Sequence, residues 1–114
     1  MKEEKFKVIQ LIRDLVVAID KDMANYPKKD AEIKNRIRTN TYDILELSYK
    51  ANISTDSDYK KKVIFDIIAK IKVIDFLLNL SLDKQLITSK RYCSLGRRLD
   101  DIAKYTNGWL KALT

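Results

Sequence analysis

The sequence contains no histidine, one cysteine, one proline and two glycines among its 114 residues. Without histidine it lacks the commonest general base and the commonest metal ligand. It also has no CxxC pair and no glycine-rich phosphate loop, so no motif in it marks a catalytic or metal site. We therefore expect a protein that is not an enzyme, with no catalytic residues, no metal and no cofactor.

The single cysteine and the short apolar runs bear on where the protein is found. Cys93 cannot form an internal disulfide, which favours a reducing cytoplasm. The longest apolar runs, 15–19 and 76–80, are too short to cross a bilayer. The first residues carry a charge every few positions, which is not the pattern of a signal peptide. We expect a cytoplasmic protein with no membrane partner.

The scarcity of glycine and proline indicates long helices, because strands need frequent turns and turns need these residues. Apolar residues recur at steps of three or four in four segments: about 4–25, 28–30 to 52, 57–82 and 89–112. In the third segment the apolar line consists of Ile64, Ile67, Ile71, Ile74 and Leu78. A chain of this length is one domain, 1–114. The predicted fold class is all-α, an antiparallel up-down four-helix bundle with short loops.

Local signals place several helix boundaries. Tyr26 precedes Pro27, and the residue before a proline avoids helical geometry, so the first helix should end there. Thr55 or Asp56 can accept hydrogen bonds from the first amides of the third helix. Ser89 is predicted to cap the fourth helix in the same way.

The fourth predicted helix carries a regular row of cations. Four of them stand at steps of seven residues: Lys90, Arg97, Lys104 and Lys111. At about 100° per residue, these four lie within roughly 60° of one another, opposite the apolar line that runs from Tyr92 to Leu113. Arg91 and Arg98 are also seven residues apart, each one position after a member of the row. We expect these two side chains to point away from the core as well. Asp101 lies within the row and can pair with Arg97 or Arg98.

The net charge of +7 and the sequence pI near 9.5 favour a polyanionic partner. Residues 88–114 hold six cations against two aspartates, so more than half of the excess lies in this segment. A basic face can equally be ordinary solvated helix surface, since lysine and arginine favour helix. A second group of candidate binding residues, near the start of the second helix, comprises Lys28, Lys29, Arg36 and Arg38.

Three stretches of the sequence resemble one protein family. They are NYPKKDAEIKNRI (25–37), YDILELSYKAN (42–52) and LDKQLITSKRYCSLGRRLDDIAKYTNGWLK (82–111). The chain resembles the accessory variability determinant (Avd) proteins of diversity-generating retroelements, which are relatives of the four-helix-bundle proteins encoded in 23S rRNA intervening sequences. The segment RIRTNTYDILEL favours the retroelement branch over the intervening-sequence branch. A mild departure is Asp101-Ile102-Ala103, where the family usually has Glu-Ile-Gly.

The resemblance implies a specific function. Such proteins form a cyclic homopentamer with a basic surface and bind the reverse transcriptase of the element and its template RNA. The complex makes cDNA with errors at adenines, and the accessory protein supplies no catalytic residue. A ring would multiply the phosphate contacts of one helix by symmetry. We expect Trp109 to pack against the first helix or to lie in a subunit interface.

Two other classes of function compete with this reading. The bundle can be a protein-interaction or assembly module, or an rRNA intervening-sequence-type protein, whose charge serves solubility and which has no retroelement role. An enzyme would need a carboxylate cluster inside the bundle, and the aspartates do not suggest one. A neighbouring reverse transcriptase gene would distinguish the retroelement accessory protein from the protein-interaction or assembly module.

Overall fold

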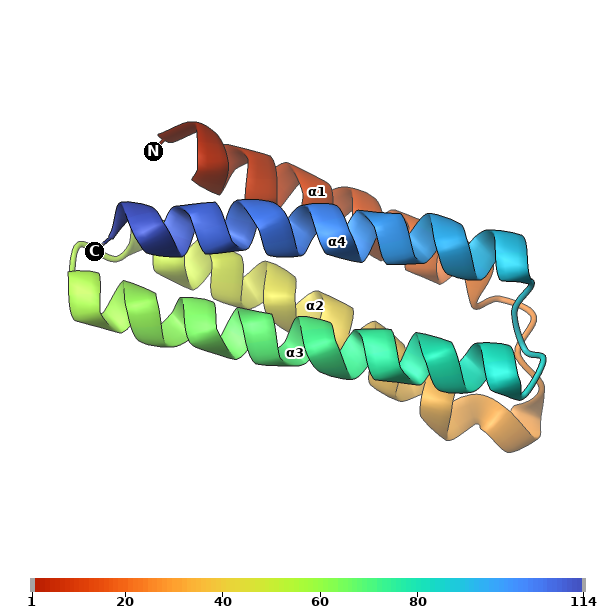
Figure 1. Ribbon diagram of the computed structural model, residues 1–114. Helices are drawn as coiled ribbons and strands as arrows, with labels where there is room; N and C mark the ends of the chain where they lie inside the picture. The colour runs from red at the N-terminus through yellow and green to blue at the C-terminus, as the bar shows by residue number, and fades with distance from the viewer. Residues whose placement is uncertain (1, 114) are drawn as a thin grey trace.

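The computed structural model describes residues 2–113, with side chains described over 6–113. Within that range it contains four long helices, one short 3-10 helix and no strand. The elements are α1 (Lys2–Asp22), η1 (Lys28–Asp30), α2 (Ala31–Ile53), α3 (Ser57–Asp83) and α4 (Ser89–Ala112). Consecutive helices run in opposite directions, as Figure 1 shows. The predicted all-α four-helix bundle is confirmed.

The four helices stand at the corners of a square. Each packs against two neighbours: α1 contacts α2 and α4, and α3 contacts α2 and α4. The diagonal pairs, α1 with α3 and α2 with α4, have no Cα atoms within 8 Å of each other among the described residues, so their backbones are not neighbours. The α1–α2 and α3–α4 connections therefore lie at one end of the bundle, and the α2–α3 connection lies at the other (Figure 1).

Aliphatic side chains from all four helices fill the centre of this square. The predicted line of α3 is buried, with Ile64, Ile67, Ile74 and Leu78 fully inaccessible and Ile71 nearly so. On α4 the predicted line is buried from Leu95 to Trp109, and its two ends, Tyr92 and Leu113, are half-buried. Trp109 is only 3% exposed, so its indole belongs to the core of this chain and is not free to form a subunit interface.

The first helix is displaced from its predicted bounds. α1 begins at Lys2 rather than residue 4, and it ends at Asp22 rather than residue 25. Residues 23–25 form a turn instead, in which the Tyr26 amide donates to the Met23 carbonyl at 3.3 Å. Met23 and Tyr26 are both buried, on either side of this turn. α1 therefore ends before the position that Pro27 marks, and the turn at 23–25 begins the connection to η1.

Side-chain caps fix the starts of α3 and α4. The Asp56 carboxylate accepts from the amides of Asp58 and Tyr59 at 3.0 and 3.3 Å, so Asp56 is the cap among the two predicted candidates. The prediction of Ser89 as the cap of α4 is wrong, because Thr88 holds that position. Its hydroxyl accepts from the Arg91 amide at 3.1 Å, and its backbone is extended, whereas Ser89 already belongs to the helix.

Candidate nucleic-acid interface

The predicted cation row lies on the outer side of α4. Lys90, Arg97, Lys104 and Lys111 are all exposed. α4 has 24 residues, and at a rise of about 1.5 Å per residue the row extends along a helix roughly 36 Å long. The buried line from Leu95 to Trp109 anchors the opposite side of the helix in the core and so fixes the direction in which the row points. The sequence predicted this orientation correctly.

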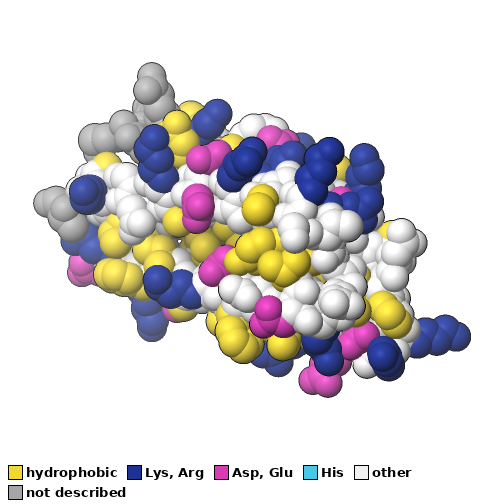
Figure 2. Space-filling view, turned by 45° about the vertical axis from the view of Figure 1, so that its right-hand side comes forward, with side chains coloured by type: hydrophobic (Ala, Val, Ile, Leu, Met, Phe, Trp, Pro, Cys, Tyr) yellow, Lys and Arg dark blue, Asp and Glu magenta, His cyan; other side chains and the backbone are white. Residues whose placement is uncertain are grey.

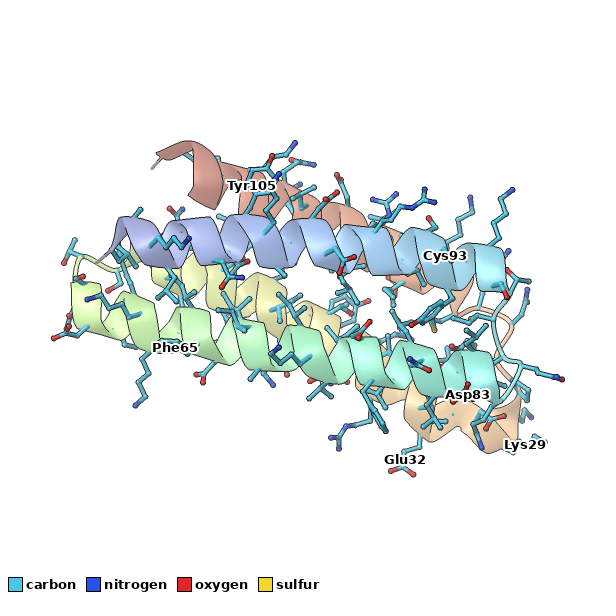
Figure 3. All side chains as sticks on the ribbon, in the orientation of Figure 1. Lys29, Glu32, Phe65, Asp83, Cys93 and Tyr105 are labelled. Atoms are coloured by element: carbon cyan, nitrogen blue, oxygen red, sulfur yellow. The ribbon has the colours of Figure 1, made fainter. Side chains whose placement is uncertain are left out.

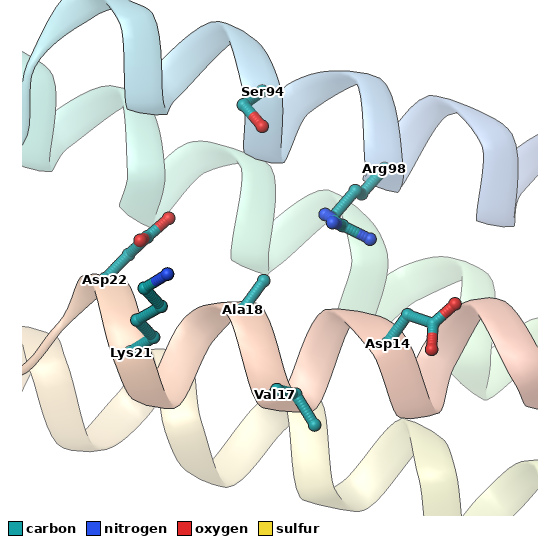
Figure 4. A pocket seen from close by; sticks show the side chains of 7 residues that line it. All are labelled: Asp14, Val17, Ala18, Lys21, Asp22, Ser94 and Arg98. Atoms are coloured by element: carbon teal, nitrogen blue, oxygen red, sulfur yellow. The ribbon is translucent and has the colours of Figure 1, made fainter.

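Arg91 and Arg98 do not point away from the core as predicted; they lie along the junction of α4 with α1. Arg91 Nε is 4.0 Å from Asp22 Oδ1. Arg98 lines a shallow hollow together with Asp14 and Asp22 of α1, and Figure 4 shows its side chain projecting from α4 toward α1. Both arginines are still exposed, so they extend the cationic surface sideways rather than along the outer row. Wheel geometry alone could not show that α1 packs on this side of α4.

α1 contributes residues to this face that the sequence reasoning missed. Lys21 lines the same hollow as Arg98, and Lys7 Nζ lies 5.9 Å from the centre of the Tyr105 ring. Lys104 Nζ lies 5.6 Å from the same ring, so a half-buried tyrosine is contacted by lysines of both helices. Lys7 and Lys21 are separated by two steps of seven residues with Asp14 between them, and this spacing was the signal that could have found them.

Carboxylates only partly offset the charge of this face. Asp14, Asp22 and Asp101 lie on α1 and α4. Asp101 forms no ion pair within 4.0 Å with Arg97 or Arg98, so the predicted pairing is absent among the described side chains. In Figure 2 lysine and arginine side chains gather along the upper edge of the molecule, whereas hydrophobic side chains reach the surface lower down. We call the surface formed by the outer row, Arg91, Arg98, Lys7 and Lys21 the α1–α4 basic face.

The second predicted group of cations is not part of this face. Arg36 and Arg38 stand on α2, which lies diagonally across the bundle from α4. Arg38 is engaged on the α1–α2 side, where its Nε lies 3.1 Å from Asp20 and its guanidinium donates to Tyr42 Oη at 3.4 Å. These bonds, that of Tyr42 first and that of Asp20 second, raise the pKa of Arg38. Because its charge is already paired, Arg38 is a weaker candidate for an external partner than the outer row of α4.

Lys28 and Lys29 lie in η1, at the end of the bundle where α4 begins. Both side chains are exposed. The α1–α2 and α3–α4 connections are tied together here by an ion pair of 3.6 Å between Lys84 and Asp30. The structure thus brings Lys28 and Lys29 to the same end as Lys90, although η1 leads into the helix diagonal to α4. In Figure 3 the labels of Lys29 and Cys93 show the positions of η1 and of the start of α4 at this end of the bundle.

The described part of the chain contains no group of three or more His, Cys, Asp or Glu side chains that could hold a metal ion. No helix within it has the length and apolarity needed to cross a membrane. Cys93 is exposed and free on the outer part of α4. The α1–α4 basic face presents exposed lysine and arginine side chains that can make ionic contacts with an anionic surface.

Comparison with known proteins places the chain in no group. No protein-family model matches the sequence, and no curated protein matches it significantly.

Proposed function

We propose that the protein is a non-catalytic accessory protein that holds RNA by its phosphate backbone through the α1–α4 basic face. The observation that carries this proposal is the row of four exposed cations along the whole of α4. Lysine and arginine contacts to phosphates supply affinity without reading bases. This mode of binding suits a bundle that presents its cations along the exposed side of one helix.

The resemblance to accessory variability determinant proteins supplies the biological setting of the proposal. In that setting the RNA is the template of a diversity-generating retroelement, and the second partner is its reverse transcriptase. The absence of a histidine agrees with an accessory rather than a catalytic role. An accessory protein of this kind would position template and enzyme for mutagenic cDNA synthesis. Assembly into a homopentamer and residence in the cytoplasm stay predictions.

The test is the double variant Arg97→Ala with Lys104→Ala, assayed for RNA binding over a series of salt concentrations. Each lost phosphate contact should lower the slope of log affinity against log salt by about 0.7–0.9. The double variant should therefore bind more weakly, with a slope smaller by about 1.5. The loss should be similar for RNAs of different sequence, because phosphate contacts carry no sequence information.

The matched control removes the same charge from another surface. Arg13→Ala with Lys50→Ala takes two exposed cations from α1 and α2. Arg13 stands seven residues before Asp20, which contacts Arg38 of α2, so Arg13 lies on the side of α1 turned toward α2. RNA binding by this control should change little. Equal losses in both variants would mean that net charge alone drives binding and would refute a defined RNA-binding face.

Binding of the reverse transcriptase gives the other readout of the same variants. A loss of enzyme binding with RNA affinity and salt slope unchanged would assign the outer row of α4 to the protein partner. Unchanged binding of both partners, with the helical content retained, would show that the row is only solvated surface.

A second candidate function, a protein-interaction or assembly module, is favoured by exposed apolar side chains. Large ones on α1 and α3 include Phe6, Phe65 and Phe76, each more than half exposed. Isolated exposed apolar residues need no explanation, but several along one helix mark an interaction surface. Binding of a partner protein through these residues, without affinity for RNA, would favour this second function.

A further inference from the structure

The outer side of α3 carries an apolar stripe that remains exposed among the residues the structure describes. It consists of Phe65, Ala69, Phe76 and Leu80, with Val73 beside it. Phe65 is 58% exposed, Phe76 64% and Val73 40%, whereas Ala69 is exposed and Leu80 is half-buried. At about 100° per residue these positions lie opposite the buried line of α3, which includes Ile67 and Ile74. The stripe runs over about four turns, a length that suits pairing with another helix.

The spacing of the stripe is symmetric. Phe65 and Ala69 are four residues apart, and so are Phe76 and Leu80. The centre of the pattern falls between Lys72 and Val73. An isologous contact requires a surface that is complementary to itself after a twofold rotation. A helix face with a symmetric spacing meets this requirement when two copies are placed antiparallel.

We propose that the outer side of α3 binds a second copy of this chain, with the two α3 helices antiparallel and the twofold axis between Lys72 and Val73. In this register Ala69 faces Phe76 of the second copy, so that a small side chain meets a large one. Phe65 faces Leu80 of the second copy. Both pairs occur twice, which buries all four apolar positions of each chain without placing the two large Phe76 rings directly opposite each other.

Charge complementarity supports the same register. Lys62 and Asp83 flank the stripe at its two ends; both are exposed, and neither forms an ion pair with another described residue. With the axis between Lys72 and Val73, Lys62 of each copy faces Asp83 of the other. Shifting the axis two residues toward the N-terminus would instead place Asp58 opposite Asp83. Like charges opposite each other disfavour that alternative. Figure 3 shows Phe65 and Asp83 toward opposite ends of α3.

The pairing differs from a ring and leaves the α1–α4 basic face uncovered. A cyclic ring uses a heterologous contact between two different surfaces, whereas the α3 contact is twofold. The proposed α3 contact therefore does not depend on whether the chain also forms a ring. Two pentameric rings joined through their α3 helices would together contain ten chains. One helix pair falls short of the standard interface of about 800 Å² per partner, so we expect a dimer that dissociates in the micromolar range.

The experiment compares the mass of the full chain in solution, over a range of concentrations, with that of four variants. Lys62→Glu places carboxylates opposite each other at both ends and should weaken dimerisation by at least about tenfold. Adding Asp83→Lys restores opposite charges and should return the affinity to within about threefold of the original. Phe76→Glu should abolish the dimer. Val17→Glu, at a residue of α1 that is 70% exposed, is the matched control and should have no effect.

Each result decides the proposal. Rescue of Lys62→Glu by Asp83→Lys supports both the second copy and the register. A monomer at every concentration overturns the proposal. So does an oligomer whose mass does not respond to Lys62→Glu or Phe76→Glu, or one that Val17→Glu disrupts. Circular dichroism confirms that each variant keeps its helices, which we expect because all four substituted positions are exposed.

Discussion

The ammonium group of Lys84 lies 3.6 Å from the buried carboxylate of Asp30. Lys84 follows α3, and Asp30 ends η1, so this pair joins the two connections at one end of the bundle. The Asp30 side chain is 6% exposed and that of Lys84 is 47% exposed. One carboxylate oxygen of Asp30 has no hydrogen-bond partner among the described residues. The ion pair therefore offsets part of the cost of burying a charge.

Removing Lys84 should destabilise the fold more than removing an ordinary surface lysine. Lys84→Ala leaves the Asp30 charge buried without its partner and should cost about 1–2 kcal/mol, a value lowered by the partial exposure of Lys84. Lys50→Ala is the comparison, because Lys50 pairs with Glu46 in solvent, and it should cost clearly less than Lys84→Ala. Urea unfolding of both variants measures the two values. Equal values would show that the Lys84 pair contributes no more than a surface pair.

The α4 cap can be tested with two adjacent hydroxyl residues. Thr88→Ala removes the acceptor for the Arg91 amide and should cost about 1 kcal/mol. Ser89→Ala changes a residue already inside the helix and should change stability by less than about 0.5 kcal/mol. Thermal unfolding of the two variants distinguishes them. A larger loss from Ser89→Ala would place the cap one residue later than the structure does.

The orientation of α4 can be tested at a buried leucine. Leu99 is 2% exposed, and Leu99→Ala should cost about 2–5 kcal/mol through lost apolar contacts and the cavity that is left. Cys93→Ala on the same helix is the control, because Cys93 is exposed and its loss should be nearly neutral. If the free energy of unfolding hardly changes for Leu99→Ala, then α4 is oriented differently and the basic row does not face outward.

Stability at alkaline pH should depend on Tyr26. Burial raises the pKa of its hydroxyl above the ordinary value, and a charge interaction with Asp30 acts in the same direction, while nearby Ser81 offsets part of the shift. Because the folded pKa is the higher one, the contribution is complete below the unfolded pKa of about 10 and is lost as pH rises through the folded pKa. Unfolding measured from pH 8 to pH 11 should therefore show an alkaline loss of stability.

Tyr26→Phe is the variant that isolates this effect. The hydroxyl is buried without a hydrogen bond of good geometry, so its removal should leave stability near pH 7 unchanged or raise it by up to about 1 kcal/mol. The alkaline loss should become smaller in the variant. An unchanged alkaline profile would mean that other groups cause it.

The sequence by itself determined the four helices and the inner lines of α3 and α4, because the three-four spacing of apolar residues is a local property of the chain. Ile64 to Leu78 on α3 and Leu95 to Trp109 on α4 were predicted by it and are buried. The outward direction of the cation row follows from the same spacing, since the side of a helix opposite its buried line must face solvent.

Only the tertiary structure decided which helix lies beside which. Arg91 and Arg98 face α1, and Lys7 and Lys21 join them, because α1 closes the square against α4 rather than against α3. Arg36 and Arg38 fall on the diagonal helix for the same reason. The stripe on α3 is visible in the sequence as isolated phenylalanines, but that it is left uncovered follows from the packing of α3 on α2 and α4 alone. Helical periodicity fixes the direction in which a side chain projects from the axis of its helix. Contacts between residues distant in sequence decide which neighbouring helix, if any, that side chain contacts.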